Sequence, residues 1–230
     1  VLLDDDFKSI PVAVRLGRRI YDNIRKATEF IFAVHLPIGG LAIAPLLTGW
    51  PIILGPVHIA LLEMIIDPIC SLSFEAEPEE ADIMRREPRD PESPLVTRAL
   101  LKWSVLQGGL ALVFLVALAA WTHFSGMEDG LFRATCFAGL ICTVLVLVFI
   151  NRSFRIGKGP HRTGHNLTFF AILGVTGAIY ASLFLIQPVA DLFHFAVLDM
   201  RGIAAVGVMV VALASVLALA KRHYGRGIAR

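Results

Sequence analysis

Two carboxylates stand inside a strongly apolar stretch of this sequence. Glu63 and Asp67 are four residues apart in the run LLEMIIDP, and this spacing places both side chains on one face of a helix, one turn apart. Pro68 follows at once and has no backbone N–H, so a carbonyl oxygen near Met64 loses its helical partner. Carboxylate and carbonyl oxygens together are the ligands of a hard cation. The pattern therefore predicts a site for an ion or a proton; the alternative is that the acids cap helices or bond Ser and Thr side chains.

A histidine in the preceding apolar stretch is the third candidate. His35 is followed closely by Pro37 and lies far enough into its span to reach the depth of Glu63 and Asp67 from a neighbouring helix. It is expected to be a ligand, a proton carrier or a counter-charge to the acids, or to hydrogen-bond one carboxylate for structural reasons alone. His58 is nearer the outer end of its helix and is expected at the membrane interface.

Composition predicts the elements that must position these residues. Hydrophobic residues make up 56% of the 230 positions and charged residues 17%, against about 25% charged in a soluble domain. Three cysteines and a net charge of +2 exclude a dense disulfide framework and give no indication of a nucleic-acid partner.

A span of the hydrocarbon core needs about 20 apolar residues. Six segments meet this length: Ala27–Leu47, Ile52–Phe74, Ala99–Trp121, Leu131–Ile150, Leu167–Ile186 and Gly202–Ala220. The predicted fold class is an all-α membrane protein with six transmembrane helices in three hairpins and an N-terminal cytoplasmic stalk helix.

The basic residues predict the orientation of these spans. Of the 21 lysines and arginines, all but Arg133 and Arg201 fall before the first span, in or close to the second and fourth connections, or after the last span. Because positive charge collects on the cytoplasmic side, both termini are expected in the cytoplasm. The predicted location is an integral protein of the plasma (inner) membrane, with the lipid bilayer as a partner.

The segment before the first span is predicted to be a helix continuous with it. Small or apolar residues recur there at helical spacing and form what we call the apolar seam: Ile10, Ala13, Gly17, Ile20, Ile24, Ala27 and Ile31. The opposite face carries Arg15, Arg18, Arg19, Asp22, Arg25, Lys26 and Glu29. This one-sided helix is expected either to pack against a cytoplasmic domain or to lie on anionic lipid.

Two further sets of residues carry structural expectations. Prolines at positions 78, 88, 91 and 94 exclude a long helix between Glu75 and Thr97, which is expected to be an ordered or semi-extended cytoplasmic connection. Five glycines are predicted to mark close helix packing. These glycines are Gly108, Gly109, Gly174, Gly177 and Gly202.

Several of these stretches resemble one known family. They are VLLDDDF at residues 1–7, IYDNIRK at 20–26 and DIMRREPR at 82–89 with Pro94-Leu95. Together they resemble P-type cation-transporting ATPases, in the class that holds calcium pumps and sodium–potassium pumps. The Gly108-Gly109 pair and the Asn151-Arg152-Ser153 end of the fourth span also fit, and the resemblance covers the whole chain as the last six of ten membrane helices.

The resemblance implies a domain organisation and a set of partners. Residues 1–8 would end the phosphorylation domain, 9–26 would form the stalk, 27–220 the six-helix transmembrane domain, and 221–230 a cytoplasmic tail. The implied partner is the N-terminal half of the pump, with four helices and the actuator, nucleotide and phosphorylation domains. ATP and Mg²⁺ would act in those domains, and no cofactor is expected in this segment.

The resemblance also implies roles for the candidate site residues. In calcium pumps the sixth helix supplies Asn, Thr and Asp, and only the Asp has a counterpart here, Asp67. Glu63 stands at the Asn position, and His35 and Ile38 stand where the fifth helix supplies Asn and Glu. These departures favour a single cation, Ca²⁺ or another divalent ion, bound by Asp67, Glu63 and His35.

Other classes of function make different demands on the sequence. A small six-helix secondary transporter or ion channel needs an internal repeat, and the Glu63–Pro68 motif has no partner in the later hairpins. A purely structural membrane subunit would not need the acidic pair. The chain contains no Walker loop, no Asp-Lys-Thr-Gly phosphorylation motif, no zinc-ligand spacing and no Ser/His/Asp set. ATP hydrolysis is therefore not expected from this chain alone.

Overall fold

A computed structural model describes residues 7, 9–80, 82–88, 92, 94–152 and 167–228. Every regular element among these residues is a helix, which confirms the all-α prediction. The helices are α1 (Ser9–Thr48), α2 (Pro56–Glu75), α3 (Arg98–Phe124), α4 (Asp129–Asn151), α5 (Leu167–Leu185), α6 (Gln187–Leu192) and α7 (Met200–Ile228). Residues 1–6, part of the stretch expected to end a phosphorylation domain, lie outside the described residues.

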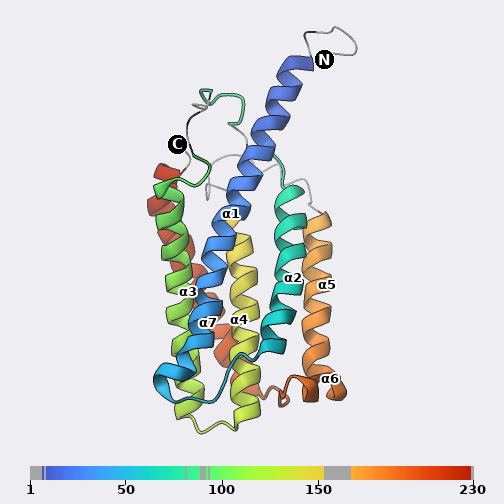
Figure 1. The fold of residues 1–230 in the computed structure, drawn as a ribbon, viewed down its shortest axis with the longest axis vertical. Coiled ribbons are helices and arrows are strands. Elements are labelled where there is room, and N and C mark those ends of the chain that lie inside the picture. Colours follow the sequence, from blue (N-terminus) through green and yellow to red (C-terminus); the bar gives the residue numbers. More distant parts are fainter. Residues whose placement is uncertain are drawn as a thin grey trace.

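Within the described residues, four helices are long and apolar enough to cross a membrane: α1, α3, α4 and α7. α2 and α5 contain shorter apolar segments, Pro56–Ile66 and Gly174–Leu185. Figure 1 shows α2 and α5 side by side along one flank of the bundle, roughly parallel to the four long helices. It also places the N- and C-terminal ends of the drawn chain at the same end of the bundle.

Local sequence explains where two of these helices begin. α2 starts at Pro56, whose fixed φ and missing N–H suit a first helical position, and His58 Nδ1 accepts a hydrogen bond from Gly55 N at 3.2 Å. Thr97 caps α3 by accepting from Leu100 N at 3.2 Å. The predicted span from Ile52 is therefore helical only from Pro56, because residues 51–55 are a non-helical connection.

The core of the bundle surrounds α4. This helix packs on α1, α3 and α7 and buries Phe132, Phe137, Leu140, Val144 and Leu147. α1 packs most extensively on α3, and Figure 1 shows its N-terminal part extending beyond the other helices. The helix α6 between α5 and α7 was not expected from the sequence.

The long helix α1 confirms that the stalk segment and the first span are continuous. The burial of the stalk part reverses the usual amphipathic pattern. Ile20 and Ile24 of the apolar seam are 51% and 46% exposed, whereas Asp22 and Lys26 of the opposite face are 5% and 1% exposed. The polar face is therefore the one that the described part of the chain covers.

Two of the five glycines lie at close helix contacts. A Cβ at Gly108 would stand 2.5 Å from Ala33 O, and one at Gly202 would stand 2.8 Å from Thr135 Oγ1. At the remaining three, a Cβ would meet no described atom within 4 Å, so the packing prediction is wrong for them. These three are Gly109, Gly174 and Gly177.

Candidate cation site

His35 on α1 and Glu63 on α2 face each other across the contact between the two helices. His35 Nε2 lies 3.9 Å from Glu63 Oε1, and the two side chains are 54% and 43% exposed. His35 Nδ1 lies 2.8 Å from Ile31 O in the preceding turn of α1. The structure thus brings together the two residues that the sequence placed at similar depth, and we refer to them as the histidine–glutamate pair.

Asp67, the third predicted ligand, lies on α2 one helical turn after Glu63. Its side chain lies outside the described residues, so the juxtaposition of the two carboxylates stays a prediction. Pro68 is accommodated inside the continuous helix α2. Among the side chains that the structure describes, no three or more of His, Cys, Asp and Glu come together as a metal site.

His58 occupies the other end of α2 and is buried within the protein. Its ring contacts Phe137, Phe193 and Phe195, with ring centroids 5.1 to 5.5 Å away, and its Nε2 lies 3.0 Å from Phe193 O. These contacts were not expected, because the aromatic residues after α6 lie far away in the sequence, and the position of His58 at the membrane interface stays a prediction. His58 has a structural role in joining α2 to the segment between α6 and α7.

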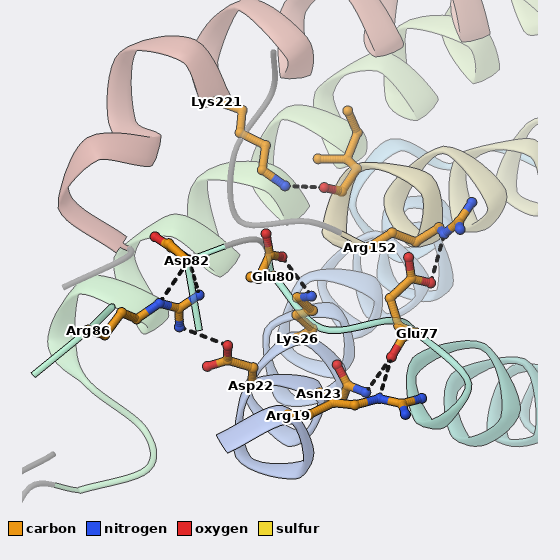
Figure 2. Close-up of polar contacts among 11 residues, drawn as sticks. Arg19, Asp22, Asn23, Lys26, Glu77, Glu80, Asp82, Arg86, Arg152 and Lys221 are labelled. Carbon is orange, nitrogen blue, oxygen red and sulfur yellow. Dashed lines mark hydrogen bonds and ion pairs between the residues drawn. The ribbon is translucent and has the colours of Figure 1, made fainter. Parts of the chain in front are cut away.

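A dense set of polar contacts joins the stalk part of α1 to the connection after α2 (Figure 2). We call this set the polar cluster; its residues are Arg19, Asp22, Asn23, Lys26, Glu77, Glu80, Asp82, Arg86 and Arg152. Some contacts run from donors on α1 to acceptors on the connection, and others run from donors on the connection to acceptors on α1. These contacts hold the two segments together along several turns of α1.

Glu77 joins three elements within the polar cluster. Its backbone oxygen accepts from Arg19 Nε and from Asn23 Nδ2, both at 3.0 Å. Its carboxylate accepts from Arg152 Nε, just after α4, also at 3.0 Å. Figure 2 shows α1 and the end of α4 meeting at this one residue.

Two further ion pairs complete the polar cluster. Arg86 bridges Asp22 on α1 at 2.8 Å and Asp82 at 2.7 Å. Lys26 Nζ lies 2.8 Å from Glu80 Oε1, with the lysine side chain 1% exposed. A buried charge needs a partner of opposite sign. These ion pairs supply such partners and so allow the charged face of α1 to be buried.

A second buried polar network joins α1 to α3, α4 and α7. Gln107 Nε2 on α3 donates to Glu29 Oε1 and to Asn151 Oδ1, both at 3.2 Å. Asn151 Nδ2 on α4 donates in return to Gln107 Oε1 at 2.9 Å. Lys221 on α7 donates its Nζ to Ile150 O at the end of α4 (Figure 2). These buried side chains fix α1, α3, α4 and α7 to one another near one end of the bundle.

Arg15 and Glu79 form the exposed edge of this region. Arg15 Nε donates to Glu79 Oε1 at 2.8 Å, and the two side chains are 57% and 28% exposed. This hydrogen bond from Arg15 lowers the pKa of the Glu79 carboxyl below its ordinary value. The pair is in water, so its stabilising effect is small.

Sequence reasoning located the charged face of α1 but missed its partners. The signal available was the matched presence of both charge signs in the connection at residues 75–97. Pairing these charges with α1 required knowing how the chain turns after α2, since Asp22 and Arg86 are 64 positions apart.

The fold and these sites define an integral membrane protein with a helical bundle, polar groups inside it, and a charged extension at one end. Residues 51–223 match the family described as "Cation transporting ATPase, C-terminus". The chain belongs to this family and is the C-terminal membrane region of a P-type cation-transporting ATPase.

Three relatives illustrate the similarity. The chain is 30% identical over 181 residues to the "Probable cation-transporting ATPase F" of Mycobacterium tuberculosis, covering 79% of this chain and 20% of the relative. It is 28% identical over 204 residues to the "Calcium-transporting ATPase" of Bacillus subtilis, covering 84% and 22%. It is 30% identical over 221 residues to the "Calcium-transporting ATPase 1" of Bacillus cereus, covering 87% and 24%. The chain thus spans between a fifth and a quarter of the length of these relatives.

Proposed function

We propose that this chain forms the ion-binding part of an ATP-driven pump that moves a divalent cation across a membrane. The observation that carries the proposal is the histidine–glutamate pair, where two groups with electron pairs to donate face each other between α1 and α2. Ionisable side chains within the membrane region of a transport protein commonly line the path of an ion, and this pair is suited to bind one.

Three residues would hold the ion. Glu63 and Asp67 supply carboxylate oxygens from successive turns of α2, and His35 supplies a ring nitrogen from α1. Pro68 leaves the carbonyl oxygen of Met64 without its helical donor, so this oxygen is available as a further ligand. Two of the relatives are named as calcium-transporting, which supports a divalent ion as the cargo.

We further propose that all six predicted spans cross the membrane. α2 has 20 residues and α5 has 19, enough to cross a core of about 30 Å. Figure 1 shows both running alongside the four long helices. With basic residues gathered at one end, the positive-inside rule puts both termini in the cytoplasm of a cell whose plasma (inner) membrane holds the protein.

The remaining parts of the pump are also proposals. P-type ATPases use ATP and Mg²⁺, and here both would act in domains outside this chain, with the stalk part of α1 carrying the coupling to the ion site. Residues 1–8 would end the phosphorylation domain, 9–26 would be the stalk, 27–220 the transmembrane domain and 221–230 the tail. The reading frame upstream of Val1 is then expected to encode Asp-Lys-Thr-Gly.

The test is the ATPase activity of the full-length protein against Ca²⁺, Mn²⁺, Zn²⁺, Na⁺ and K⁺ one at a time, with Mg²⁺ present throughout. At least one ion should stimulate hydrolysis, and Asp67→Asn should remove that stimulation. Asp191→Asn, an exposed acid on α6, is the matched control and should keep it. Unchanged stimulation in Asp67→Asn would falsify the site. Ion movement that continues without ATP would indicate a secondary transporter or channel instead.

A further inference from the structure

The orientation of the His35 ring decides which of its nitrogens can bind an ion. Nδ1 lies 2.8 Å from Ile31 O, and a carbonyl oxygen can only accept a hydrogen bond. Nδ1 therefore carries the hydrogen, and in the neutral ring Nε2 holds a lone pair. Metal-binding histidines are held in this way, with the second nitrogen donating to a backbone carbonyl or a carboxylate.

The nitrogen that holds the lone pair lies near a second electron-pair donor. Glu63 Oε1 lies 3.9 Å from His35 Nε2, too far for a direct hydrogen bond and close enough for one metal ion to touch both atoms. An ionised carboxylate accepts only, so a positive species between the two groups is what makes this arrangement favourable. The two side chains are 54% and 43% exposed, so the described residues do not enclose either of them.

The donor types discriminate between classes of ion. Ca²⁺ takes six to eight oxygen ligands, with no nitrogen among them. Imidazole nitrogen combined with carboxylate oxygen suits Mn²⁺, Fe²⁺, Co²⁺ and Zn²⁺. Asp67, one turn along α2 from Glu63, would add a third ligand without changing this preference.

Resting on the proposed function, we propose that the transported cation is a divalent transition-type metal, of the Mn²⁺ to Zn²⁺ series, with His35 Nε2 and Glu63 Oε1 among its ligands. His35 is then the residue that determines specificity, because it replaces an oxygen ligand by nitrogen. The family resemblance suggested Ca²⁺ as the transported ion; this proposal replaces Ca²⁺ with a different class of divalent ion.

The direct test is the binding of Mn²⁺ to the full-length protein, followed by pulsed electron paramagnetic resonance. Mn²⁺ bound to the unmodified protein should show coupling to a histidine nitrogen. His35→Gln should remove that coupling and weaken Mn²⁺ binding about tenfold or more, the scale of lost metal-site interactions. His223→Gln, an exposed histidine on α7, is the matched control and should leave both unchanged.

A second variant, His35→Asp, tests the same ligand assignment if His35→Gln folds poorly. His35→Asp exchanges the nitrogen ligand for a carboxylate oxygen, so the preference for Mn²⁺ over Ca²⁺ in competition binding should fall by about tenfold or more. Size-exclusion chromatography of each variant checks that it is folded.

The outcomes separate this inference from the proposed function. Bound Mn²⁺ without nitrogen coupling, or an unchanged ion preference in folded His35→Asp, overturns the ligand assignment even if Ca²⁺ stimulates ATP hydrolysis. Coupling that depends on His35 supports the assignment. If no ion then stimulates hydrolysis, the pump proposal fails while the metal site stands.

Discussion

The polar cluster and the histidine–glutamate pair are two charged regions on the same helix, and they differ in how completely the protein satisfies them. In the polar cluster, Lys26 and Glu80 approach to 2.8 Å, and the lysine is 1% exposed. In the histidine–glutamate pair, His35 Nε2 and Glu63 Oε1 are 3.9 Å apart and about half of each side chain is exposed. The charges of the polar cluster are neutralised by partners in direct contact, whereas the histidine–glutamate pair has room for a cation between its two groups.

The chemistry of the groups differs in the same direction. The polar cluster pairs cations with anions, so its net demand for further charge is small. The histidine–glutamate pair sets a carboxylate against a ring nitrogen whose hydrogen is on the other side of the ring. We infer that the polar cluster stabilises the packing of the helices and that the histidine–glutamate pair binds the transported cation. The same substitution should therefore have opposite consequences in the two regions.

The largest expected effect is on ion binding at the histidine–glutamate pair. Glu63→Gln removes the carboxylate charge, so the affinity for the stimulating cation should fall by more than about 100-fold, beyond the usual loss from an outer-shell change. The free energy of unfolding should change by less than about 1 kcal/mol because the side chain is half-exposed. Cation titrations of ATPase activity and thermal unfolding in detergent measure the two quantities. A folded variant with normal cation affinity would contradict the assignment of Glu63.

The matching change in the polar cluster should show the reverse pattern. Glu80→Gln withdraws the negative charge beside the buried Lys26, so unfolding should become easier by about 3 kcal/mol. Its cation affinity, measured in the same titration, should stay within about twofold. The double variant Glu80→Gln with Lys26→Met should recover much of the stability, because it removes the buried charge as well. An equally unstable double variant would show that Glu80 stabilises through contacts other than this ion pair.

A close helix contact links the two regions and provides a test that touches neither set of charges. Gly108 on α3 packs against Ala33 and Leu36 of α1, two residues before and one residue after His35. Gly108→Ala puts a methyl group 2.5 Å from Ala33 O, so α1 must shift, with a loss of about 1 to 3 kcal/mol and weaker cation binding. Gly109→Ala is the control, since its Cβ meets no described atom within 4 Å. Equal effects of the two variants would indicate a change in helix propensity rather than in the α1–α3 contact.

Apolar length was enough to predict the helices, and side-chain spacing was enough to predict part of the site. The six apolar segments correspond to six helices of the described residues, because a long apolar segment satisfies its backbone hydrogen bonds internally as a helix. His35 and Glu63 were expected at one depth, and the structure brings them together. Their role as ligands is a prediction that the geometry leaves for experiment.

The surroundings of the stalk could not be predicted from local pattern. Helical periodicity identified two faces of α1, and contact of the apolar seam with a cytoplasmic domain or with anionic lipid stays a prediction. Burial of the charged face was not predicted; among the described residues it is covered because Glu77, Glu80 and Arg86 contact it from the next connection. Such long-range pairing depends on how α1 and α2 are joined and packed. For the same reason, the burial of His58 against Phe193 and Phe195 was not foreseen.

The smallest expected effect concerns Arg15 and Glu79, at the exposed edge of the polar cluster. Arg15 lowers the pKa of Glu79 in the folded protein. Stabilisation by this pair is therefore fully present above the ordinary glutamate pKa of about 4.3 and is lost as the pH falls through the lower folded value.

Arg15→Gln should slightly reduce the melting temperature at pH 7 and make no difference once Glu79 is protonated. Raising the salt concentration at pH 7 should also shrink the difference, because both side chains are in contact with solvent. A loss of stability that is independent of pH and salt would show that Arg15 acts by packing its aliphatic stem. In that case charge would matter only where the polar cluster is buried, as at Lys26.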